Sequence, residues 1–149
     1  MVLGVLEGEH CRGHSWSATA LPQHQRRDTC PGGPPGARGF LEECCRRHRC
    51  LVSSVHWEEP WRPETMREAV ELLERLGVEN VGVDVRALAR RAYRMAAERG
   101  WSPRRRLDLM HLLAAVELGC HGVVAVDRFI ARRAREYGLL YVNHYTGCP

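Results

Sequence analysis

The chain has 149 residues, enough for one domain with a buried core of its own. Its formal net charge is +4, all 22 basic residues are arginine, and no apolar run is long enough to cross a membrane. This mild positive charge permits a nucleic acid partner but does not demand one. The opening apolar residues lead directly into Glu7 and Glu9, which excludes the form of a signal peptide, so we expect a cytoplasmic protein with no membrane contact.

The N-terminal segment, residues 1–39, differs in composition from the rest of the chain. It is rich in Pro, Gly, His and Cys and has no sustained apolar period, which predicts a poorly ordered segment. Only residues 2–6 have the composition of a strand. One hypothesis that accounts for the abrupt change near Phe40 is that residues 1–39 come from a displaced reading frame.

From residue 40 onward, helical and strand patterns alternate. The pattern predicts helices over residues 40–49, 64–76, 85–99, 107–118 and 129–137, and strands over residues 51–55, 78–83, 122–126 and 139–142. Pro63 suits the first turn of a helix, Gly77 its end, and Asp84 is a candidate N-cap of the next helix. The alternation predicts an α/β domain over residues 40–142, with a parallel sheet covered by helices and a tail over residues 143–149.

The helix expected over residues 107–118 is apolar nearly all round and carries few polar residues. Two of them, Asp108 and His111, lie three apart and therefore share a face. Such a helix belongs in the middle of a fold, where a carboxylate must be hydrogen-bonded, paired or bound to a metal. Asp127 ends the following strand, at the edge where parallel α/β sheets bind ligands. The two acids are therefore candidates for one site.

Each acid also has a structural explanation. Asp108 in a first helical turn favours the helix dipole, and Asp127 can be the N-cap of the next helix. Two carboxylates near 4 Å repel each other by about 4 kcal/mol at an effective dielectric of 20, so a shared site requires a cation. Hard oxygen ligands suit Mg²⁺ or Mn²⁺.

The order of these motifs resembles the C-terminal half of the PIN domain family. Asp108-Leu-Met-His111-Leu-Leu-Ala114 resembles the D-x-x-H-L-x-x-A helix of that family. Val-Ala-Val-Asp127-Arg-Phe129 resembles its acid at a strand end, followed by an aromatic residue. The resemblance extends over about residues 40–142 and is most specific over residues 107–142. It implies a PIN-like three-layer α/β/α fold with a central parallel sheet.

Most PIN domains are metal-dependent nucleases, and many are toxins of the VapC type that cleave RNA. The resemblance therefore implies an endoribonuclease that hydrolyses RNA with Mg²⁺ or Mn²⁺ held by Asp108, Asp127 and Glu59. We prefer Glu59 to Glu58 for the early acid of the family. The resemblance also implies a small antitoxin protein as partner and a tendency to form a homodimer.

The chain departs from the family pattern at two points. The first strand of the family ends in an acid, for which this chain offers only Glu7 and Asp28 as weak candidates. The family commonly has Thr or Ser two residues before its last acid, and this chain has Ala125 there. The alternative is thus a catalytically impaired PIN-like domain that binds RNA or a protein partner.

Several residues near the two acids are candidates for contact with RNA. Arg104, Arg105 and Arg106 precede Asp108, and Arg128 follows Asp127, so their side chains could reach phosphate groups. An ordinary solvated surface explains Arg104, Arg105 and Arg106 equally well, and it is the preferred explanation for Arg128. His111 could orient a carboxylate or touch the substrate, and its structural alternative is a satisfied histidine of the core.

A third interpretation is a zinc-binding module that uses cysteine and histidine. The candidate ligands are His10, Cys11, His14, Cys44, Cys45, His48 and Cys50. Neither half of this set has paired C-x-x-C spacing, and Cys44 and Cys45 also fit a buried helix face. The seven cysteines are an odd number, and we expect no disulfide framework in a cytoplasmic chain.

Overall fold

The computed structural model describes residues 3–6, 37–143 and 145–149. The elements in chain order are β1 (Leu3–Leu6), α1 (Ala37–Arg47), β2 (Arg49–Ser53), η2 (Ser54–Glu58), α2 (Pro63–Arg75), β3 (Glu79–Val81), α3 (Val85–Glu98), η3 (Pro103–Arg105), α4 (Arg106–Glu117), β4 (Gly122–Val124), α5 (Arg128–Ala134), η4 (Arg135–Tyr137) and β5 (Leu140–Val142). Outside the described residues lie Glu7, His10, Cys11, His14 and Asp28, so their predicted roles stay predictions.

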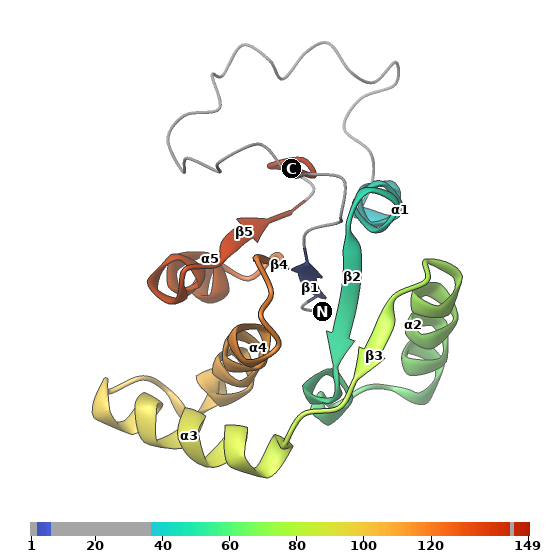
Figure 1. Ribbon diagram of the computed structural model, residues 1–149. Helices are drawn as coiled ribbons and strands as arrows, with labels where there is room; N and C mark the ends of the chain where they lie inside the picture. The colour runs from blue at the N-terminus through green and yellow to red at the C-terminus, as the bar shows by residue number, and fades with distance from the viewer. Residues whose placement is uncertain (1–2, 7–36, 144) are drawn as a thin grey trace.

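The strands form one sheet in the order β3-β2-β1-β4-β5 (Figure 1). β2 is parallel to β3 and β4 is parallel to β5, whereas β1 runs antiparallel to both β2 and β4. The α/β class is confirmed, and the sheet is mixed where a parallel one was expected. An apolar run predicts burial of a strand but carries no information on its direction. Because β2 and β4 point the same way, their carboxyl ends lie at the same edge of the sheet.

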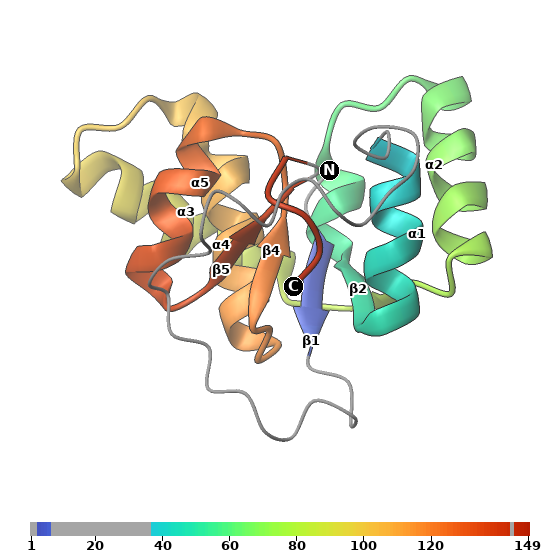
Figure 2. The same cartoon turned by 90° about the horizontal axis from the view of Figure 1, so that it is seen from above.

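Helices pack against both faces of this sheet (Figures 1 and 2). On one face, Leu51 of β2 and Val123 of β4 pack with side chains of α4 and α5. The next residues along the same strands, Val52 and Val124, pack on the other face with side chains of α1 and α2. The alternation follows from the two-residue period of a strand. It places α4 and α5, which carry the candidate acids, on one side of the sheet.

α4 is buried on more than one side, as its apolar sequence predicts. Leu112 and Ala115 pack against the sheet, while Leu109 and Leu113 pack against α3 in a separate cluster. Each fully buried aliphatic side chain of this kind stabilises the fold by about 1.5–3 kcal/mol. α4 is therefore a rigid support for the polar residues that it carries.

Local end signals act as expected. Pro63 opens α2, Gly77 follows it with a φ of 66°, and the Asp84 side chain accepts a hydrogen bond of 2.9 Å from the Ala87 amide. Ser102 is the N-cap of the short η3, which precedes α4. The first helix begins at Ala37, earlier than expected, and β2 lies two residues earlier than the strand expected over residues 51–55. The strands β3, β4 and β5 are shorter than expected.

A disulfide bond joins Cys44 of α1 to Cys148, across 104 residues of sequence. The expectation of no disulfide was therefore wrong for this pair, because nothing in the local pattern shows which distant cysteines meet. Nε2 of His48 also lies 2.8 Å from the Pro149 carbonyl oxygen. The last two residues, Cys148 and Pro149, are thus bound to the C-terminal part of α1 and to His48 after it. In the described part of the chain, no helix has the length and apolar character to cross a membrane.

Candidate active site

The three candidate acids come from three separate segments at one edge of the sheet. Glu59 follows β2 and η2, Asp127 follows β4, and Asp108 lies in the first turn of α4. β2 and β4 end at the same edge, so the segments after them are brought to the same side of the molecule. This is the edge at which α/β sheets commonly bind ligands.

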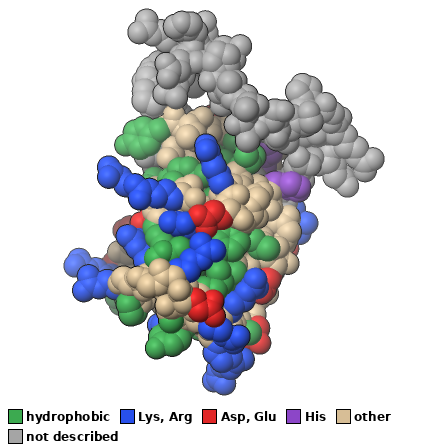
Figure 3. All heavy atoms as spheres, turned by 90° about the vertical axis from the view of Figure 1, so that its left-hand side faces the viewer, with side chains coloured by type: hydrophobic (Ala, Val, Ile, Leu, Met, Phe, Trp, Pro, Cys, Tyr) green, Lys and Arg blue, Asp and Glu red, His purple; other side chains and the backbone are tan. Residues whose placement is uncertain are grey.

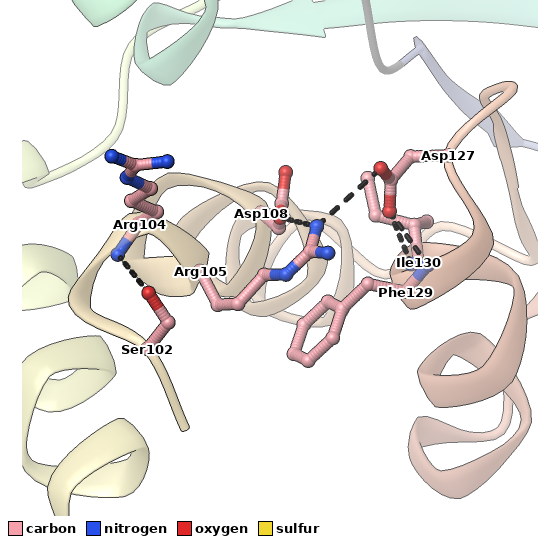
Figure 4. Close-up of polar contacts among 7 residues, drawn as sticks. All are labelled: Ser102, Arg104, Arg105, Asp108, Asp127, Phe129 and Ile130. Carbon is pink, nitrogen blue, oxygen red and sulfur yellow. Dashed lines mark hydrogen bonds and ion pairs between the residues drawn. The ribbon is translucent and has the colours of Figure 1, made fainter.

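Asp108 and Asp127 share one cationic partner, Arg105 (Figure 4). Nη1 of Arg105 lies 3.1 Å from Oδ2 of Asp108 and 3.5 Å from Oδ2 of Asp127. The arginine approaches from the end of η3, just before α4. Two carboxylates from different elements thus converge on a single positive charge, which offsets their mutual repulsion.

The two carboxylate oxygens of Asp127 have different partners. Oδ1 accepts hydrogen bonds of 2.7 Å from the Phe129 amide and 3.1 Å from the Ile130 amide, which makes Asp127 the N-cap of α5. Oδ2 faces Arg105. The structural role and a cation-binding role therefore use different atoms and are compatible.

Asp108 is held in a partly buried position in which ionisation is less favourable than in water. Burial raises its pKa above the usual value, and the negative charge of Asp127 acts in the same direction. The hydrogen bond and charge of Arg105 lower the pKa, but only in part. A carboxylate of this kind gains from a nearby cation.

Glu59 has different partners and forms a second polar group with two buried histidines. Its Oε1 lies 2.9 Å from Nε2 of His111 and 3.8 Å from Nδ1 of His56. Burial tends to raise the pKa of Glu59, but the hydrogen bond and the charges of the histidines hold it below the usual value. Glu59, which we preferred to Glu58 as the early acid, thus contacts buried histidines, whereas Glu58 is exposed.

His56 was not identified as a functional candidate from the sequence. Its side chain is fully buried against Trp57 and Trp61, and neither ring nitrogen has a hydrogen-bond partner among the described residues. Burial lowers its pKa to about 4. The spacing of His56 and Glu59, three residues apart in a helical turn, is the sequence signal that could have suggested this pair.

Within residues 3–6, 37–143 and 145–149, no group of three or more His, Cys, Asp or Glu side chains is arranged to hold a metal ion. The predicted trio of Asp108, Asp127 and Glu59 is therefore divided into an aspartate pair with Arg105 and a glutamate bound by histidines. α4 connects the two groups, because Asp108 and His111 lie one turn apart on it.

The surface around the aspartate pair is rich in arginine. Between Val85 and Arg135 there are twelve arginines and four acidic residues, and Figure 3 shows many of these basic side chains on the side where α3 and α5 lie. Arg104, Arg106 and Arg128 are exposed. Arginines also stack on aromatic rings here. The guanidinium carbon of Arg133 lies 4.8 Å from the centre of the Trp101 ring, and that of Arg105 lies 5.0 Å from the centre of the Phe129 ring.

The cysteine and histidine set proposed for zinc is only partly available. The sulfur of Cys44 is bonded to Cys148, and His48 contacts the C-terminal carbonyl group. Cys45 and Cys50 are free thiols that contact each other.

No protein-family model, curated protein or solved structure matches the chain.

Proposed function

We propose that this protein is a PIN-type, metal-dependent endoribonuclease that hydrolyses phosphodiester bonds of RNA. The observation that carries the proposal is the convergence of Asp108 and Asp127 on one cation at the carboxyl edge of the sheet. These are the two acids of the PIN-like motifs, whose order and spacing suggested the family. The cytoplasmic location and the three-layer PIN fold remain part of this proposal.

The donor set fits Mg²⁺ or Mn²⁺. Each aspartate presents an Oδ2 atom to the same point, and carboxylate oxygens are the preferred ligands of these ions. Asp108 and Asp127 would hold the ion, and Glu59 would join them only after a change of partner. When bound, a divalent cation neutralises the phosphate and lowers the pKa of a coordinated water.

The residues of the chain have separable tasks in this proposal. Asp127 is fixed by its two amide hydrogen bonds, and α4 places Asp108 opposite it. His111 orients Glu59 from a buried position. Arg104, Arg106 and Arg128 would contact phosphate groups of the RNA, since they are exposed on the arginine-rich side of the domain.

The test is cleavage of single-stranded RNA with Mg²⁺ or Mn²⁺ by the wild type and by Asp108→Asn. We expect the variant to lose activity by about 100-fold or more, because it removes a charge on which the cation depends. Glu117→Gln is the matched control, since Glu117 lies at the other end of α4 and pairs with Arg91 at 3.5 Å. Equal cleavage by the wild type and Asp108→Asn would contradict the proposal.

The second candidate function is a non-catalytic PIN-like domain that binds RNA or a protein partner. Two contacts favour it. Glu59 binds a histidine and not the aspartates, and Arg105 contacts both Asp108 and Asp127 where a metal ion would bind. Mn²⁺ titration distinguishes the nuclease from the non-catalytic domain. The nuclease binds Mn²⁺ and loses this binding in Asp108→Asn. The non-catalytic domain binds RNA in a salt-dependent manner, and its Mn²⁺ binding is the same in the wild type and in Asp108→Asn.

The proposed partners can be tested separately. A toxin-like protein of this kind would bind a small antitoxin and form a homodimer. Light scattering of the purified chain across a concentration series measures the oligomeric state. A monomer at all concentrations would remove the dimer from the proposal without affecting the proposed nuclease site.

A further inference from the structure

Arg105 occupies the position at which the proposed cation would bind. A single atom, Nη1, contacts Oδ2 of both Asp108 and Asp127. For Asp127, Oδ2 is also the oxygen that remains available, because its Oδ1 is taken by the amides at the start of α5. Guanidinium groups are natural partners of carboxylates, and the single charge of Arg105 offsets one of the two negative charges of this pair.

Arg105 and a divalent cation cannot hold the same two oxygens together. Carboxylate oxygens bind Mg²⁺ at about 2.0–2.1 Å, so the ion takes the lone pairs that now face the guanidinium. The double positive charge of the ion would also lie within a few ångströms of the positive charge of Arg105, and the two cations would repel each other strongly. One of the two cations must leave the pair when the other binds.

Arg105 has the freedom to leave. Its side chain is 43% exposed, and it is attached to the short η3 and not to the buried body of α4. The guanidinium also contacts the Phe129 ring, whose centre lies 5.0 Å from the guanidinium carbon. This is a cation–π contact of the guanidinium itself, and at an exposed site it is too weak to hold the group on the aspartates.

We infer that Arg105 is a built-in competitor of the metal: it holds Asp108 and Asp127 together without a divalent cation and is displaced from them when the cation binds. This inference rests on the proposed function for the identity of the cation. Arg105 is accordingly a positioning residue that sets the metal concentration at which the site fills. It also explains how two partly buried carboxylates remain side by side without metal.

The test measures Mn²⁺ binding by the electron paramagnetic resonance signal of free Mn²⁺. Arg105→Met removes the charge, and with it the cation–π contact with Phe129, and keeps an unbranched side chain. We expect its Kd for Mn²⁺ to fall about tenfold, a moderate gain because the ion pair is partly exposed to solvent. Arg104→Met is the matched control: Arg104 is the neighbouring exposed residue, and Figure 4 shows its guanidinium directed away from both aspartates.

The inference is overturned if Arg105→Met binds Mn²⁺ no tighter than the wild type, or if Arg104→Met gains as much. Arg105→Lys provides a second variant that retains the charge, and its Kd should lie between those of the wild type and Arg105→Met. Circular dichroism checks the fold of each variant. The gain must also disappear in the double variant Asp108→Asn/Arg105→Met, since the pair no longer exists there.

RNA cleavage distinguishes failure of this inference from failure of the proposed function. Tighter Mn²⁺ binding by Arg105→Met without cleavage by any variant supports the competition and removes the nuclease. Cleavage that depends on Asp108, with no gain in Mn²⁺ affinity for Arg105→Met, supports the nuclease and removes the competition. If neither the wild type nor Arg105→Met binds Mn²⁺, both are contradicted.

Discussion

Nε2 of His111 lies 2.9 Å from Oε1 of Glu59, although the two residues are 52 positions apart in sequence. The contact ties the segment after η2 to the middle of α4, and the imidazole that makes it is 4% exposed. A carboxylate that is partly buried in this way depends on its partner for stabilisation.

His111→Leu should lower the free energy of unfolding by about 1–3 kcal/mol, because it leaves the partly buried Glu59 without its hydrogen bond. Urea unfolding monitored by circular dichroism measures the change. Glu58→Gln is the matched control on the neighbouring exposed carboxylate and should have almost no effect. A loss as small as that of the control would show that the contact contributes little.

The buried His56 should make the protein sensitive to mild acid. Burial lowers its pKa from 6.5 to about 4, so the unfolded chain binds a proton before the folded one does. Stability is complete above pH 6.5 and falls as the pH decreases toward 4, by about 3 kcal/mol in total. His56→Phe should flatten this slope in urea unfolding measured across that range, whereas the exposed His121→Gln should retain it.

Glu59 should extend this acid sensitivity to lower pH. Its folded pKa is depressed, so the stability it contributes is present above the ordinary value of 4.5 and is lost as the pH falls below that value through its folded pKa. Two imidazoles, those of His56 and His111, face its carboxylate. A Glu59→Gln variant that unfolds along the same pH curve as the wild type below 4.5 would contradict this account.

Much of the fold was predictable because its signals are local. The N-cap at Asp84 and the end of α2 at Gly77 depend on a few neighbouring residues. The apolar residues on all sides of α4 predict its burial on several sides. The antiparallel direction of β1 and the bond between Cys44 and Cys148 depend on segments that meet across the sheet or the chain ends. No periodicity in a single sequence encodes such meetings.

The same distinction applies to the candidate site. Asp108 and Asp127 could be named because each stands at a recognisable place, a first helical turn and a strand end. The position of Arg105 between them depends on side-chain direction, which spacing alone does not give. The sequence offered Arg105 only as one of several arginines for RNA. Its contact with both acids makes it the most informative residue to mutate.

The disulfide should stabilise the folded chain because it closes a long loop. Cys148→Ser removes the bond between residues 104 apart and should lower the free energy of unfolding by about 2–4 kcal/mol. Urea unfolding of the wild type with dithiothreitol should show the same loss. The variant itself should not respond to dithiothreitol, and a further loss there would indicate that another disulfide contributes.

Cys45 should be the most reactive free thiol of the described part of the chain. A hydrogen bond from Cys50 lowers the pKa of Cys45, which is partly exposed, whereas burial and the same contact raise that of Cys50. Burial also raises the pKa of Cys120 to about 11. Iodoacetamide should therefore modify Cys45 before Cys50 and Cys120 in the folded protein, as read by mass spectrometry. Cys50→Ala should slow that reaction, and an unchanged rate would contradict the role of the hydrogen bond.

Asp127 allows its structural role to be separated from its role toward a cation. Asp127→Asn keeps an oxygen that can accept the hydrogen bonds of the Phe129 and Ile130 amides, so its stability should stay within about 0.5 kcal/mol of the wild type. Asp127→Ala loses the cap and should cost about 1 kcal/mol. Both variants lack the charge that faces Arg105, so both should weaken Mn²⁺ binding to the same extent. Urea unfolding and Mn²⁺ titration of the two variants distinguish the helix-capping role from the cation-binding role. If Asp127→Asn retains full Mn²⁺ affinity, Asp127 is a helix cap alone.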